Sequence, residues 1–99
     1  MLQAQIFIDK DDLYQERKLH EFIMEFLLTR KVLGATSFEG HSGFGPDHQL
    51  QRPDRLFSFD EPPMVIIFVD EEERTKSVVR ELRKVFKGGL IITTQVEKW

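Results

Sequence analysis

Glycine marks the two stretches of this 99-residue chain whose backbone could take part in binding. Four of the six glycines lie between residues 34 and 45, and the other two form the pair Gly88-Gly89. Glycine adopts backbone angles with positive φ and lets a ligand approach the main chain closely. We therefore expect any binding site of this protein to lie where the two glycine clusters meet.

The segment that follows the first cluster carries side chains that could bind ions. His41 and His48, with Asp47 between them, could hold a divalent cation through neutral imidazole nitrogens, or they could be polar loop residues without a ligand. Arg52 and Arg55 could contact an anion or the acidic surface of a partner protein, or remain solvated.

Composition limits the classes of function. The 40% apolar and 31% charged residues are usual for one globular domain, and we expect residues 1–99 to form it. The chain has no cysteine, which excludes disulfides and thiolate metal sites. A formal charge of −3 argues against binding to nucleic acid. No apolar run is long enough for membrane insertion and no signal-peptide pattern is present, so we expect a cytoplasmic protein.

Hydrophobic periodicity predicts the elements that position these residues. Alternation over residues 2–8 predicts a strand, and a 3.6-residue period over 16–31 predicts a helix that ends at Gly34. Further strands are expected at 35–40, 64–69 and 90–96, with a second helix from a capping-box-like Asp70 to the glycine pair. The segment 41–59 is expected to be a long loop, with a strand extension at 56–59 as one alternative.

The predicted order βαββαβ indicates a ferredoxin-like α+β fold, in which a four-stranded antiparallel sheet carries both helices on one face. No element remains to cover the other face. Residues 64–69 are nevertheless apolar on both sides of the strand, and Phe7 points away from the main face of the first strand. We therefore expect another copy of the chain to cover the open face.

The glycine segment also resembles a known family. Gly34-Ala35-Thr36, then Gly40, then Gly43-Phe44-Gly45 resemble the small bacterial proteins of domain-of-unknown-function family 190, which are similar to the PII signal-transduction superfamily. The resemblance covers nearly the whole chain. It implies a non-enzymatic regulatory protein that forms a trimer. It also implies a long loop that contacts a partner protein, often a membrane transporter or channel; here Arg52 and Arg55 would make that contact.

The same resemblance implies a ligand site between subunits, built from the base of the long loop and the turn before the last strand. Its ligand would be a nucleotide or another anion, held by backbone N–H groups and one lysine. The residues that match these two segments are Gly43, Phe44, Gly45, Lys87, Gly88 and Gly89.

Two alternatives remain open at the level of sequence. One is a small enzyme on a ferredoxin-like oligomer with a pocket lined by His20 or His41, although no nucleophile, histidine and carboxylate constellation is recognisable. The other is a metal-responsive trimer resembling divalent-cation tolerance proteins, with His41 and His48 as metal ligands.

Overall fold

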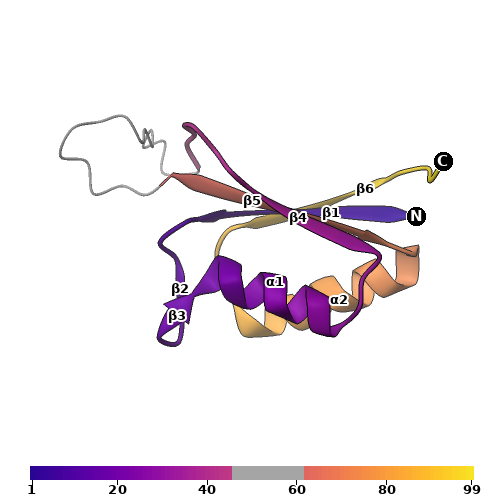
Figure 1. The fold of residues 1–99 in the computed structure, drawn as a ribbon, viewed down its shortest axis with the longest axis horizontal. Helices are drawn as coiled ribbons and strands as arrows, with labels where there is room; N and C mark the ends of the chain where they lie inside the picture. Colours follow the sequence, from indigo (N-terminus) through magenta and orange to yellow (C-terminus); the bar gives the residue numbers. More distant parts are fainter. Residues whose placement is uncertain (46–61) are drawn as a thin grey trace.

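The computed structural model describes residues 1–45 and 62–99 and shows a four-stranded main sheet with both helices on the same side (Figure 1). The predicted strand extension at 56–59 and the residues His48, Arg52 and Arg55 lie outside the described residues. The elements are β1 (Leu2–Asp9), β2 (Leu13–Tyr14), β3 (Arg17–Lys18), α1 (Leu19–Thr29), β4 (Gly34–Glu39), β5 (Pro63–Asp70), α2 (Glu72–Val85) and β6 (Leu90–Gln95).

The main sheet has the strand order β4-β5-β1-β6, and each neighbouring pair is antiparallel. The long central strands β1 and β5 pair along their whole length, from Leu2 opposite Asp70 to Asp9 opposite Pro63. Helix α1 packs over β4 and β5, and α2 packs over β1 and β5. The predicted ferredoxin-like fold is confirmed.

The core lies between the helices and one face of the sheet. Alternate residues of both central strands are buried there, which confirms that the period-two pattern of residues 2–8 marks the core face. Each helix adds a buried stripe at three- and four-residue spacing. The core cluster consists of Ala4, Ile6, Ile8, Leu19, Ile23, Leu27, Met64, Ile66, Phe68, Val78 and Leu82.

The first helix begins three residues later than predicted, because a small hairpin precedes it. Strands β2 and β3 pair through Leu13–Lys18 and Tyr14–Arg17. The Tyr14 ring packs 4.4 Å from the ring of Phe22 on α1, and Arg17 bonds Glu25 of the same helix at 2.8 Å. The sequence pattern missed the hairpin because its two-residue strands are too short to show a period.

The first helix also ends differently from the prediction, which placed the stop at Gly34. The helix ends at Thr29, and Lys31 adopts a left-handed conformation with φ of 56°. The N–H of Lys31 donates to the carbonyl of Leu28 at 3.0 Å, and the N–H of Val32 donates to that of Leu27 at 3.4 Å. These two bonds form a Schellman motif, with lysine in the position that glycine usually occupies.

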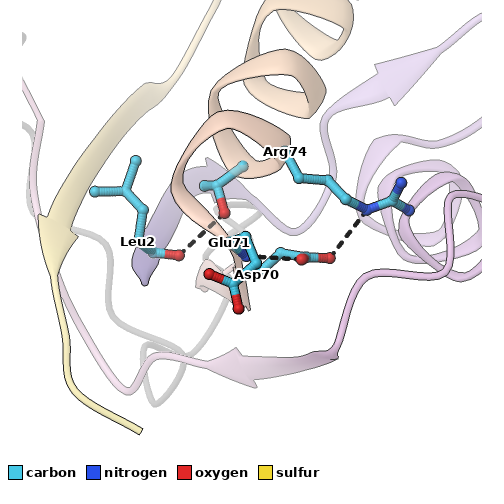
Figure 2. A network of polar contacts seen from close by, with 5 residues as sticks. Leu2, Asp70, Glu71 and Arg74 are labelled. Carbon is cyan, nitrogen blue, oxygen red and sulfur yellow. Dashed lines mark hydrogen bonds and ion pairs between the residues drawn. The ribbon is translucent and has the colours of Figure 1, made fainter.

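Polar contacts fix the start of α2 at the end of the sheet where β1 begins (Figure 2). The buried Thr75 hydroxyl donates to the Leu2 carbonyl at 3.1 Å. The buried Asp70 carboxylate accepts the N–H of Glu71 at 2.7 Å and the Nε of Arg74 at 3.1 Å. The predicted capping box is not formed, because the helix cap is Glu71 and Asp70 bonds its neighbours instead.

The described residues contain no helix with the length and hydropathy that a transmembrane span requires.

The left-handed Lys31 generates a stability prediction. A residue with a Cβ loses roughly 1–2 kcal/mol of stability in this conformation. Substitution by glycine would recover only part of this, because glycine is more flexible in the unfolded chain. We expect Lys31→Gly to raise the free energy of unfolding by about 0.5–1 kcal/mol in a urea titration. Lys31→Ala removes the same charge but keeps the strain, so it should give no gain. An equal gain from both variants would contradict the backbone explanation.

Candidate functional site

The two glycine clusters lie at the same end of the sheet. Strand β4 runs parallel to β1, while β5 and β6 run the other way. The end of β4, which leads into Gly43-Phe44-Gly45, is therefore at the same end as the turn from Lys87 to Gly89 that enters β6. The β2–β3 hairpin extends from this end as well (Figure 1).

Within one chain, the clusters are nevertheless on opposite edges of the sheet. Strands β4 and β6 are the two outer strands, with β5 and β1 between them. Three strand spacings of about 4.8 Å separate the edges by roughly 14 Å. A single subunit therefore places the two halves of the predicted site at one end without closing a site between them.

The glycines of the first cluster differ in what surrounds them. A Cβ on Gly40 would stand 2.7 Å from Cγ of Pro63, and one on Gly43 would stand 3.3 Å from the same atom. Packing against Pro63 thus explains these two glycines. Among the residues that the structure describes, none comes within 4 Å of a Cβ built on Gly45, and the Phe44 side chain is 66% exposed.

The two glycines of the second cluster also differ in their surroundings. Gly89 has φ of +68°, and a Cβ there would lie 2.5 Å from the carbonyl oxygen of Phe7. Gly88 has open space around its Cα. The Lys87 ammonium donates to the carbonyl of Arg83 at 2.6 Å, so it bonds the end of α2. Gly89 is required by the fold, whereas Gly45 and Gly88 have no such packing explanation.

Arg83 organises the turn, and the sequence analysis did not single it out. Its Nη1 donates to the Gly88 carbonyl at 2.7 Å and lies 3.5 Å from the Phe86 carbonyl, while Nη2 lies 3.5 Å from the Gly89 carbonyl. The guanidinium also lies 5.2 Å from the centre of the Phe86 ring. The available signal was its place in the last helical turn, where cationic side chains bond free carbonyls.

An acidic turn follows β1 at the same end of the sheet. Carboxylate oxygens of Asp9, Asp11 and Asp12 lie within 4.8 Å of one another. Burial raises the pKa of the Asp12 carboxyl above its ordinary value; the nearby charges of Asp9 and Asp11 act in the same direction, and a bond from the Asp9 N–H opposes them. That bond, 3.0 Å long, closes the turn and gives the Asp12 carboxylate a structural role.

The structure describes two of the three candidate histidines; His48 lies outside the described residues, so the predicted metal pair of His41 and His48 stays a prediction. His41 is exposed just after β4, and His20 is half-buried on α1. A groove of about 600 Å³ lies between the end of α1 and the start of β4, lined by apolar residues that include Met24, Leu28 and Leu33. Neither histidine lines this groove.

The sheet face away from the helices is apolar, and most so at the end that carries the glycine clusters. The strand register places Phe38, Val65, Phe7 and Leu90 side by side across all four strands. The next row holds Thr36, Ile67, Gln5 and Ile92, and the row after it holds Gly34, Val69, Gln3 and Thr94. Phe38 and Leu90 are 53% and 54% exposed. The outward triplet of β5 is therefore Val65, Ile67 and Val69.

The family model DUF190, described as "Uncharacterized ACR", matches residues 1–98. The chain belongs to this family. The resemblance seen in the glycine segment is thereby confirmed. The chain is also 30% identical over 93 residues to a UPF0166 protein of Aquifex aeolicus (strain VF5), covering 93% of this chain and 87% of that protein.

Two solved structures share the fold of this DUF190 chain. One is CPII from Thiomonas intermedia K12, a nitrogen regulatory PII-like protein bound to ADP, AMP and bicarbonate; it aligns with a TM-score of 0.63 at 21% identity over 94% of this chain and 82% of that one. CutA of Pyrococcus horikoshii aligns with a TM-score of 0.67 at 14% identity, over 100% of this chain and 87% of that one.

The glycine pair generates a prediction that separates fold from binding. We expect Gly89→Ala to lower the free energy of unfolding by about 2–4 kcal/mol, because the new Cβ would meet the Phe7 carbonyl and the positive φ would be strained. Gly88→Ala, its control, should change stability by less than about 0.5 kcal/mol. Urea unfolding measures both, and equal losses would show that Gly88 is also fixed by packing.

Proposed function

We propose that this DUF190 protein is a non-enzymatic, PII-like regulatory protein that binds a small anionic ligand in a cleft between subunits. The observation that carries the proposal is the position of Gly43-Phe44-Gly45 and Lys87-Gly88-Gly89 at one end of the sheet but on opposite edges. In a closed ring of copies, the β4 edge of one subunit would stand beside the β6 edge of the next. Each cleft would then contain one glycine cluster from each neighbour.

The open sheet face supports assembly in the same arrangement. Seven of its twelve residues are apolar, and they are concentrated at the end that holds the glycine clusters. Contiguous apolar patches on soluble proteins commonly mark interaction surfaces. Burial of this face is worth on the order of several kcal/mol per subunit before the cost of association. We propose a homotrimer, as the likeness to PII proteins implies.

The chemistry of the turns favours an anionic ligand. Backbone N–H groups of glycine turns bind phosphate and carboxylate groups, and Arg83 and Lys87 add positive charge beside one turn. CPII, which has a similar fold, was solved with ADP, AMP and bicarbonate. We therefore propose a nucleotide as the ligand, with bicarbonate as the smaller anion to test.

We propose that the segment 41–59 contacts a partner protein. Arg52 and Arg55 would bind an acidic surface of that partner. The likeness to PII proteins, whose loop after the second strand reaches a membrane transporter or channel, supports this assignment. In this scheme, a ligand bound at the base of the loop would change the conformation of the loop and thereby its binding to the partner.

Calorimetric titration of the full chain with ADP, AMP and bicarbonate tests the ligand. We expect saturable binding of ADP with one site per chain. Gly88→Glu should abolish it, because a carboxylate would stand beside the anion at a position where the side chain has room. Ser77→Glu adds the same charge at an exposed site on α2 and should leave binding unchanged. No heat with any of the three ligands would contradict the proposed site.

Light scattering at micromolar concentration tests the assembly. The unsubstituted protein should be trimeric, and Ile67→Lys should make it monomeric, because the lysine would stand in the middle of the open face. Ser77→Lys, on the exposed side of α2, should remain trimeric. Circular dichroism should show that both variants stay folded. A monomeric unsubstituted protein would rule out the proposed intersubunit cleft.

A further inference from the structure

The side chain of Arg83 contacts three carbonyls of the turn between α2 and β6. Helix α2 ends at Val85, and Phe86 already has extended backbone angles. The carbonyls of Phe86, Gly88 and Gly89 all lie within 3.5 Å of the Arg83 guanidinium, and the Phe86 ring lies beneath it. A planar guanidinium carries five donors in a fixed arrangement, so it can hold several carbonyls in one orientation as an ammonium cannot.

The orientation of these carbonyls decides where the backbone donors point. In a trans peptide, the C=O of one residue and the N–H of the next are directed to opposite sides. No cis peptide occurs in the described chain. Because Arg83 binds the Phe86 and Gly88 carbonyls, the N–H groups of Lys87 and Gly89 are directed away from Arg83.

These donors are available for a ligand. In the part of the chain that the structure describes, the N–H groups of Lys87, Gly88 and Gly89 have no hydrogen-bond acceptor in the protein. Gly88 and Gly89 are exposed at this turn. Backbone N–H groups that face outward from a turn and have no acceptor in the protein can bind an anion.

We propose that Arg83 is the positioning residue of the anion site, and this inference rests on the proposed function. Arg83 bonds the inner side of the turn through the carbonyls, so that the outer side presents the N–H groups of Lys87 and Gly89 to the ligand. Lys87 is bonded to the Arg83 carbonyl and completes the end of the helix. The ligand contacts the backbone, and Arg83 acts on it through the backbone.

Substitutions at Arg83 test the proposal with ADP as the probe. Arg83→Met keeps the length of the side chain and its contact with Phe86 but removes every donor, so ADP affinity should fall about tenfold or more. Arg83→Lys restores the charge and a single donor nitrogen, without the planar arrangement of the guanidinium, and should recover part of that loss. Arg80→Met, at an exposed position one turn earlier on α2, should bind ADP within about twofold of the unsubstituted protein.

A second readout separates positioning from a general loss of structure. In ¹⁵N-labelled protein, ADP should shift the amide signals of Lys87 and Gly89, and Arg83→Met should abolish these shifts while the melting temperature falls by only a few degrees. Equal ADP affinity in Arg83→Met and the unsubstituted protein would overturn the inference and leave the proposed function standing. If the unsubstituted protein does not bind ADP, the proposed nucleotide site fails and the inference fails with it.

Discussion

The antiparallel register between β1 and β5 is the constraint on which the rest of this structure depends. Eight residues of each strand are paired, and alternate side chains of both enter the same core. A slip of one residue would turn Ile6 or Ile66 to the open face and bring Phe7 or Ile67 under the helices. Both outer strands take their register from these two strands, because within residues 1–45 and 62–99 strand β4 pairs with β5 alone and β6 with β1 alone.

This register also decides what lies on the open face. Once the core residues are fixed, the opposite positions of the four strands form three rows, and the most apolar row lies at the end that carries both glycine clusters. The same topology that builds the core therefore places an apolar surface beside the candidate site. It also divides that site between the two edges of the sheet. Assembly and ligand binding are linked in the proposed trimer for this reason.

Glycine serves two physical needs in this small domain. At Gly40 and Gly89 it makes room for a neighbouring group, Pro63 in one case and the Phe7 carbonyl in the other. At Gly45 and Gly88 no neighbour among the described residues requires it, which is the expected environment where backbone is left open to a ligand. Both kinds of glycine occur in the turn that Arg83 contacts, since Gly88 is in open space and Gly89 is crowded.

The sequence by itself determined the fold, the faces of the first strand and helices, the apolar character of the open face and the family. These features depend on local periods and spacings, which a linear pattern records directly. The pattern also marked the glycine clusters as a candidate site, but it could not show which glycines are crowded, because Pro63 and the Phe7 carbonyl are distant in the chain.

Only the tertiary structure decided the remaining points. Residues 64–69 are apolar on both sides, so the outward triplet of β5 was fixed by pairing with β1 and not by the pattern of the strand itself. The hairpin at β2–β3 depends on contacts of Tyr14 and Arg17 with α1. The end of α1 depends on the left-handed conformation of Lys31, which a lysine rarely adopts. The role of Arg83 in the turn could not be predicted from the sequence, because its partners are backbone carbonyls and every residue has a carbonyl. Only the path of the chain after α2 shows which carbonyls it contacts.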